Sequence, residues 1–214
     1  MLSLKSWAQA VTYLLEKVYP LGTQQREVIE YGLVIALSTL AGLGLLILVA
    51  AALGLLFPTL LVLLAAGSLR LSAGGAHCSA PWRCNLLGVL VFPALGYTVS
   101  VLSAYKTPAI LVYVILSLTI AVGTVFWQAP VLTANKPLSA LRRQRLCLRA
   151  RATVLGVSAL ALFFLSRGFD QAAIGLATGL LWQGFTLLPL GWQVIGSFDQ
   201  LLSGGYTTRR REGY

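Results

Sequence analysis

Long apolar blocks separated by short polar segments run through most of the chain, and this pattern predicts an all-helical membrane protein. A helix needs about twenty mostly apolar residues to cross the hydrocarbon core. The chain contains six candidate stretches, of which the second and fifth are shorter than this. We therefore expect a bundle of about six transmembrane helices, at residues 31–53, 55–69, 86–104, 108–127, 152–167 and 171–191.

The N-terminal segment, residues 1–29, has a different pattern. Apolar residues recur at spacings of three and four from Leu4 to Val18, and polar residues occupy the positions between them. This spacing predicts an amphipathic helix that lies in the membrane interface and breaks near Pro20 and Gly22. A cap helix that stays in water is the alternative interpretation.

Composition supports the membrane assignment. Hydrophobic residues make up 57% of the chain and charged residues only 10%, with a mean hydropathy of +0.82, which excludes an ordinary soluble domain. The net charge is +10, and the basic residues bunch between the apolar stretches. Such clusters suit anionic lipid headgroups or an acidic partner. Nucleic-acid binding is not expected, because the aromatic residues lie mostly within or beside apolar segments.

The distribution of basic residues predicts the orientation. In a six-span topology, all but Lys106 and Arg167 of the sixteen basic residues fall on one side of the membrane. By the positive-inside rule this side is the cytosol. We therefore expect both termini in the cytosol, a membrane domain at residues 30–192, cytosolic loops at 70–85 and 128–151, and a basic cytosolic tail at 193–214.

The loop between the second and third spans contains the residues best suited to chemistry. It holds His77, the only histidine of the chain, and two of the three cysteines, Cys78 and Cys84. A cysteine becomes a nucleophile when an imidazole at hydrogen-bond range removes its proton, and a nearby cation such as Arg83 favours the thiolate. We therefore consider a dyad of His77 and Cys84.

The backbone must turn for this dyad to form, because an unbroken helix would hold residues seven apart at about 10 Å from one another. Gly74, Gly75 and Pro81 predict such a turn, with Cys84 at the start of the third span. The free N–H groups of a helix start could bind an oxyanion. No third residue that orients His77 is evident; the candidates are Ser72, Ser79 and Asn85.

Two other functions remain open from the residues alone. Six spans are common in transporters, although no charged residue lies within a span to bind an ion. His77, Cys78 and Cys84 could also supply three ligands to a zinc ion, but no fourth ligand and no H-E-x-x-H motif is present. We expect neither a metal nor another cofactor.

Several motifs resemble the AgrB family of membrane cysteine endopeptidases. They are the run Gly74-Gly75-Ala76-His77 followed by Cys84, the preceding Arg70, Glu30-Tyr31-Gly32 ahead of the first span, and Asn135-Lys136-Pro137-Leu138 with the basic run after it. The resemblance covers nearly the whole chain. It implies that Cys84 is the nucleophile and His77 the base in trimming a small AgrD-type propeptide. The trimmed peptide is then closed into a thiolactone or lactone, the precursor of a secreted quorum-sensing signal.

The resemblance also implies partners and binding residues. The propeptide is expected to carry an acidic tail, and the candidate substrate-binding residues are Arg70, Gly75, Lys136, Arg142, Arg143, Arg145 and Arg149. The basic residues are also expected to bind anionic lipids. A homodimer is a hypothesis that rests on the family and on the glycine-lined faces around Gly42 and Gly175. Cys78 stands where the family often has alanine, which leaves open which thiol reacts.

Overall fold

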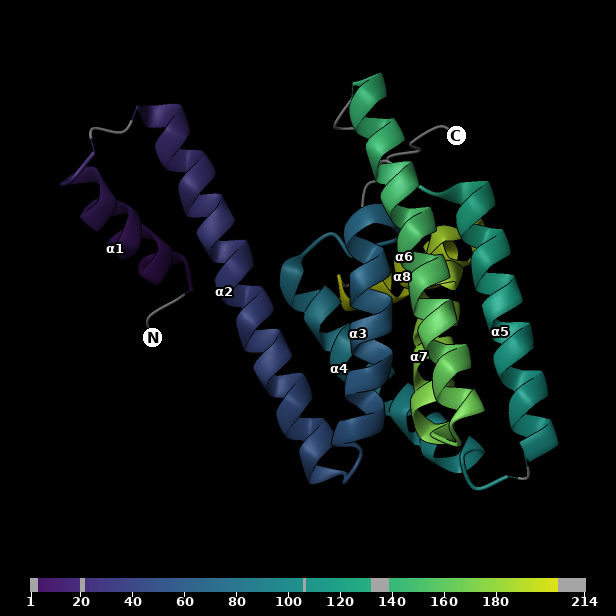
Figure 1. The fold of residues 1–214 in the computed structure, drawn as a ribbon. Coiled ribbons are helices and arrows are strands. Elements are labelled where there is room, and N and C mark those ends of the chain that lie inside the picture. The colour runs from purple at the N-terminus through teal and green to yellow at the C-terminus, as the bar shows by residue number, and fades with distance from the viewer. Residues whose placement is uncertain (1–3, 20–21, 106, 132–138, 204–214) are drawn as a thin grey trace.

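The computed structural model describes residues 4–19, 22–105, 107–131 and 139–203, and the described chain folds into eight helices (Figure 1). This confirms the predicted all-helical fold. The helices are α1 (Leu4–Glu16), α2 (Thr23–Ala52), α3 (Leu56–Ala73), α4 (Pro81–Leu102), α5 (Thr107–Gln128), α6 (Ala140–Ser166), α7 (Asp170–Leu187) and α8 (Pro189–Leu202).

Five helices, α2 to α6, are long and apolar enough to cross a membrane. Helices α7 and α8 meet this criterion only as a pair, and the chain bends by 83° between them. The count of five, or six with this pair, agrees with the prediction of about six spans. Helices α3 and α4 meet at the same end of the bundle as the start of α6 and the end of α7 (Figure 1). The side of the membrane that this end faces stays a prediction.

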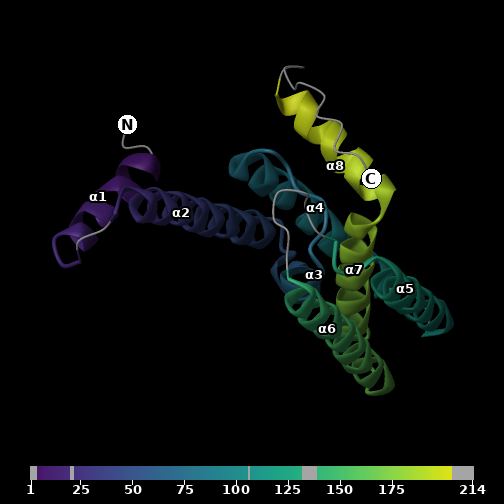
Figure 2. The ribbon, with the colours of Figure 1, turned by 90° about the horizontal axis from the view of Figure 1, so that it is seen from above.

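Helix α7 forms the centre of the bundle and packs against α3, α5 and α6 (Figure 2). Its small residues let α3 approach closely: a Cβ atom added at Gly175 would lie 2.7 Å from Leu61 Cβ, and one at Gly179 would lie 2.7 Å from Ala65 Cβ. The expectation of close glycine packing is therefore confirmed at these two positions. Because α3 occupies this face within one chain, the face cannot also support the predicted homodimer.

The N-terminal region is two helices and not one amphipathic helix over residues 1–29. The break near Gly22 is confirmed, but the polar residues after it form the first turns of α2, which begins at Thr23. Arg26 joins the two helices, since its guanidinium lies 3.6 Å from Glu16 and 3.0 Å from Glu30. Helix α1 and the first half of α2 diverge from the rest of the bundle (Figures 1 and 2).

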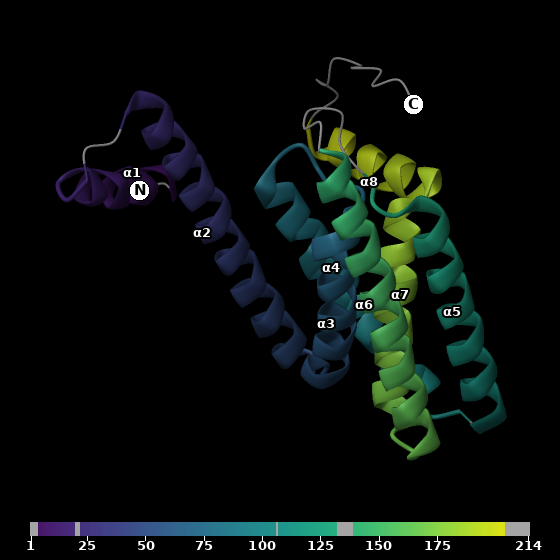
Figure 3. The same cartoon turned by 45° about the horizontal axis from the view of Figure 1, so that its top comes forward.

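Two predicted polar segments are largely helical. The basic run expected in the loop 128–151 forms the start of α6, which begins at Ala140 and is 27 residues long. Arginine has a high helix propensity, so a helix can continue beyond its apolar part. The expected tail at 193–214 begins as α8, which lies across the end of α7 (Figure 3). Pro189 starts this helix, because proline is favoured at the first helical position.

Candidate functional site

The segment between α3 and α4 turns as the sequence predicts. Gly74 has φ = 74° and Gly75 has φ = 127°, and both angles lie in a region that favours glycine. Helix α3 therefore ends at Ala73, and the chain runs without helix until Pro81 starts α4. This geometry places Cys84 in the first turn of α4, as expected.

Hydrogen bonds hold this segment against α7 and α3. The Ala76 N–H donates to the Thr186 carbonyl over 2.9 Å, and Gln183 Nε2 donates to the Gly74 carbonyl over 2.6 Å. From α3, Arg70 Nη2 donates to the Ala76 carbonyl over 2.7 Å. The central helix of the bundle thus fixes the backbone just before His77.

The residue between the candidate base and the candidate nucleophile contacts both of them. The Cys78 N–H donates to Cys84 Sγ over 3.2 Å, and the Cys78 carbonyl lies 3.1 Å from His77 Nδ1. A carbonyl can only accept a hydrogen bond, so in the neutral imidazole this contact requires the proton on Nδ1 and leaves Nε2 as the acceptor. His77 is exposed and Cys84 is half-buried. Among the described contacts, His77 and Cys84 do not hydrogen bond to each other directly.

The two thiols of the loop lie in different environments. Cys78 is buried, and burial raises the pKa of its thiol to about 12, with a further contribution from the adjacent Cys84 sulfur. Cys78 therefore stays protonated at neutral pH and is a poor nucleophile. Cys84 is the more accessible of the two. The exposure of Cys84 and the protonated state of Cys78 together favour Cys84 as the reactive thiol.

Helix α8 covers the histidine side of this loop. The Trp192 and His77 rings meet edge to face, with centroids 6.1 Å apart. Asp199 anchors the helix, because its Oδ1 accepts from Arg83 Nη1 over 3.1 Å and from Ser79 Oγ over 3.2 Å. The sequence did not identify Trp192 or Asp199, which lie in or next to the expected tail.

Arg83, expected as the cation beside the Cys84 thiolate, pairs its charge with Asp199, which weakens the effect that this cation can have on the thiol. The three candidates for orienting His77 also have other partners. Ser79 donates to Asp199, Asn85 donates to Ser38 on α2, and Ser72 donates to the Leu69 carbonyl. The imidazole contacts the Cys78 carbonyl and the Trp192 ring.

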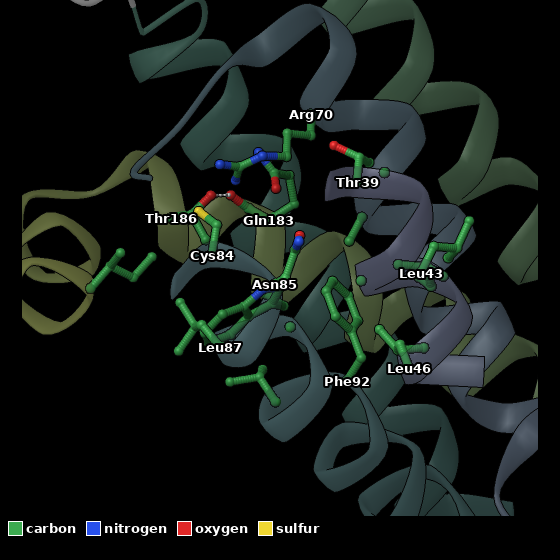
Figure 4. Close-up of a pocket in the computed structure, with 18 of the residues that line it drawn as sticks. Thr39, Leu43, Leu46, Arg70, Cys84, Asn85, Leu87, Phe92, Gln183 and Thr186 are labelled. Carbon is green, nitrogen blue, oxygen red and sulfur yellow. Dashed lines mark hydrogen bonds between the residues drawn. The ribbon is translucent and has the colours of Figure 1, made fainter. Parts of the chain in front are cut away.

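A cavity of about 290 Å³ opens beside Cys84 (Figure 4). Helices α2, α3, α4 and α7 form most of its wall, and Ile195 of α8 and Ala76 complete it. Cys84, Arg70, Gln183 and Thr186 lie at one end, and leucine and phenylalanine side chains lie farther in (Figure 4). The candidate nucleophile thus faces a space in which a ligand can bind.

The sequence matches the family described as AgrB, accessory gene regulator B, over residues 8–187. The chain belongs to the AgrB family. It is 23% identical over 188 residues to an AgrB-like protein of Clostridium perfringens (strain SM101 / Type A), an alignment that covers 82% of this chain and 87% of the relative. An AgrB-like protein 2 of Clostridium perfringens (strain 13 / Type A) is 23% identical over 186 residues with the same coverage. No solved structure matches the chain.

The structure separates the expected substrate-binding residues of this AgrB-family protein. Arg70 lines the cavity beside Cys84. Gly75 is buried, and a Cβ atom there would lie 2.6 Å from Thr186 Oγ1. Gly75 thus shapes the loop, and its position does not favour contact with substrate. Lys136 lies outside the described residues. The remaining four are exposed on the first turns of α6 and do not line the cavity: Arg142, Arg143, Arg145 and Arg149.

The alternative zinc site does not form. Over the described ranges, no group of three or more His, Cys, Asp or Glu side chains is arranged to hold a metal ion. Cys78 uses its backbone to contact His77 and Cys84, and its thiol is buried. The three residues therefore converge through the backbone N–H and carbonyl of Cys78 and not around a common centre.

Proposed function

We propose that this AgrB-family protein is a membrane cysteine endopeptidase that cleaves an AgrD-type propeptide, with Cys84 as nucleophile and His77 as general base. The observation that supports this most directly is the position of Cys78, whose N–H contacts the Cys84 sulfur while its carbonyl contacts the imidazole. An N–H donor stabilises negative charge on the sulfur. The Nδ1–H contact leaves Nε2 free to accept the thiol proton.

The first half of the reaction is acyl transfer. His77 Nε2 takes the proton of Cys84, and the sulfur attacks the carbonyl carbon of the scissile peptide bond. The tetrahedral intermediate collapses when the imidazolium returns the proton to the leaving amine and the C–N bond breaks. The C-terminal fragment leaves, and the N-terminal fragment remains attached to Cys84 as a thioester.

The second half closes the ring. A thiol or hydroxyl within the attached peptide attacks the thioester carbonyl, transfers its proton to His77 and displaces Cys84, which regains a proton. The product is a thiolactone or lactone that is lighter by one water than the linear trimmed peptide. The thioester retains much of the energy of the peptide bond, so no other energy source is required. Exclusion of water from the cavity would favour this route over hydrolysis.

The basic start of α6 suits recruitment of the substrate. Its exposed arginines lie at the same end of the bundle as the start of α4, which holds Cys84. Each cation near an anionic surface contributes about 1 kcal/mol of attraction. We propose that this end faces the cytosol, where these arginines bind anionic lipids and the acidic tail expected for the propeptide.

The proposal is tested by incubating the protein in liposomes with a propeptide and analysing the products by mass spectrometry. Wild type is compared with Cys84→Ala and His77→Ala, and Cys147→Ala on α6 is the matched control. We expect the C-terminal fragment and the ring from wild type and Cys147→Ala, and neither product from the two dyad variants. Equal cleavage by Cys84→Ala would overturn the peptidase proposal and favour transport of the peptide without processing.

A further inference from the structure

We infer that the cavity beside Cys84 is a specificity pocket for a large apolar side chain of the substrate, next to the bond that Cys84 attacks. This inference rests on the proposed peptidase function and adds the kind of substrate residue that the site selects. It follows from the lining of the cavity, from two glycines that keep it open, and from its size.

The lining becomes apolar with distance from the nucleophile. Cys84, Gly88, Val91 and Phe92 lie on one face of α4, because residues at spacings of four, seven and eight lie on the same side of a helix. The opposite walls add Leu46 from α2 and Leu63 from α3. A substrate side chain that enters beside the Cys84 sulfur passes the Asn85 amide, which is hydrogen-bonded to Ser38, and then meets mainly hydrocarbon (Figure 4).

Two glycines in the lining keep the space open. A Cβ atom at Gly67 on α3 would meet nothing within 4 Å, and one at Gly88 would meet only the Phe92 ring at 3.8 Å. These glycines differ from Gly175 and Gly179, where a Cβ atom would overlap the neighbouring helix. Helix packing therefore does not require glycine at positions 67 and 88. Larger side chains there would project into the cavity.

The size and polarity of the cavity favour a peptide side chain as the occupant. A volume of about 290 Å³ is near the lower limit of about 300 Å³ for small-molecule sites, so it suits one or two side chains. The polar groups Arg70, Gln183 and Thr186 lie at the Cys84 end, where a peptide backbone would present its carbonyl and N–H groups. Arg70 and Gln183 each donate one hydrogen bond to the loop, to the Ala76 and Gly74 carbonyls, and have further N–H donors. A peptide backbone can accept from these donors, whereas a lipid chain could fill only the apolar part.

The cavity can be tested without relying on peptidase activity, by labelling the protein in liposomes with N-methyl-, N-butyl- and N-hexylmaleimide. Peptide mass spectrometry gives the labelling rate of Cys84 relative to that of Cys147, which corrects for partitioning of the reagents into the membrane. We expect this ratio to rise at least 10-fold from the methyl to the hexyl reagent in wild type. The rise should be lost in Gly67→Leu and in Gly88→Leu, and kept in Gly123→Leu, whose Cβ atom also meets nothing within 4 Å.

Gly67→Leu on α3 and Gly88→Leu on α4 are both used, so that a folding defect in one variant does not decide the result. The folding of each variant is checked by gel filtration in detergent. A ratio that does not depend on chain length in wild type would overturn the pocket. The same holds for a dependence that survives in both leucine variants.

The substrate specificity is then measured with a propeptide that wild type cleaves. Replacing a large apolar residue beside the scissile bond with alanine, at one side and then at the other, should lower kcat/KM about 10- to 100-fold at one of the two positions. Gly67→Leu should reduce this preference. If neither replacement changes kcat/KM while maleimide labelling shows the cavity, the specificity role is wrong and a lipid is the occupant. If no propeptide is cleaved by any form, the peptidase proposal itself fails, and the specificity role fails with it.

Discussion

The ion pair between Arg83 and Asp199 is predicted to hold α8 over the segment between α3 and α4, which contains His77. The side chains are 16% and 12% exposed, and the charged atoms lie 3.1 Å apart. Removing one partner of a fully buried pair costs about 3–5 kcal/mol, and a hydrogen bond to a charged group contributes about 1.5–3 kcal/mol. Because this pair keeps some contact with water, we expect Asp199→Ala to lower the free energy of unfolding by about 2 kcal/mol.

The same change should impair catalysis, since α8 carries Trp192, which packs against the His77 ring. Without Asp199, Arg83 keeps its hydrogen bond to Ser79 Oγ, which is 3.0 Å long, but loses its counter-charge. We expect kcat/KM for propeptide cleavage to fall about 10-fold in Asp199→Ala and similarly in Arg83→Ala. The double variant should be little worse than either single variant, because both remove the same interaction.

The assay is a double-mutant cycle, with unfolding in SDS followed by tryptophan fluorescence and cleavage measured in liposomes. Gln200→Ala is the control, because Gln200 is an exposed neighbour of Asp199 on α8. We expect a coupling energy of about 1–3 kcal/mol between Arg83 and Asp199. Additive effects of the two changes, or an Asp199→Ala variant no less stable than Gln200→Ala, would refute the anchoring role of the pair.

Three further changes test separate parts of the site. Gly75→Ala should lower cleavage at least 10-fold, because alanine at φ = 127° costs about 1–3 kcal/mol, whereas Gly123→Ala should not. Cys78→Ala should retain cleavage from pH 7 to 9, since a thiol with a pKa of about 12 is neutral in this range. Loss of cleavage in this variant would implicate Cys78 in the chemistry. Replacing both Arg142 and Arg143 with glutamine should raise KM about 30-fold at low salt with little change in kcat, since each charge contributes about 1 kcal/mol. Arg167→Gln, at the other end of α6, should leave KM unchanged.

The spans could be predicted from the sequence because lipid requires a continuous apolar helix, so each span leaves a long block in the chain. The turn before His77 could also be predicted, since Gly74, Gly75 and Pro81 act through local backbone geometry. The place of Cys84 in the first turn of α4 followed from the same residues. These features depend on short stretches of sequence.

The parts that were missed depend on contacts between distant segments. Asp199 lies 116 residues from Arg83, and nothing in the local sequence indicates that the two meet. The signals for α8 in the sequence were Pro189 at its start and the spacing of Trp192, Ile195 and Asp199 on one helical face. The cavity could not be predicted either. A glycine in the sequence does not show whether it borders a cavity, as Gly67 does, or packs closely against another helix, as Gly179 does.

The basic segment was misassigned for a different reason. The charged residues predict an end of the membrane helix, but they end only its contact with hydrocarbon. Ser139 Oγ accepts a hydrogen bond from the Arg142 N–H, so the helix starts there and carries the arginines on its first turns. A serine followed by residues of high helix propensity was the signal in the sequence.

The most direct test of the central proposal is to trap the acyl-enzyme. A propeptide whose ring-closing thiol or hydroxyl is replaced by alanine cannot cyclise, so the thioester should accumulate after release of the C-terminal fragment. The protein is denatured in acid, digested and mapped by mass spectrometry. We predict a mass increase equal to the trimmed peptide minus one water on Cys84, removed by neutral hydroxylamine and absent from Cys84→Ala. An adduct on Cys78, or a cleaved propeptide with no adduct on Cys84, would contradict the proposed mechanism.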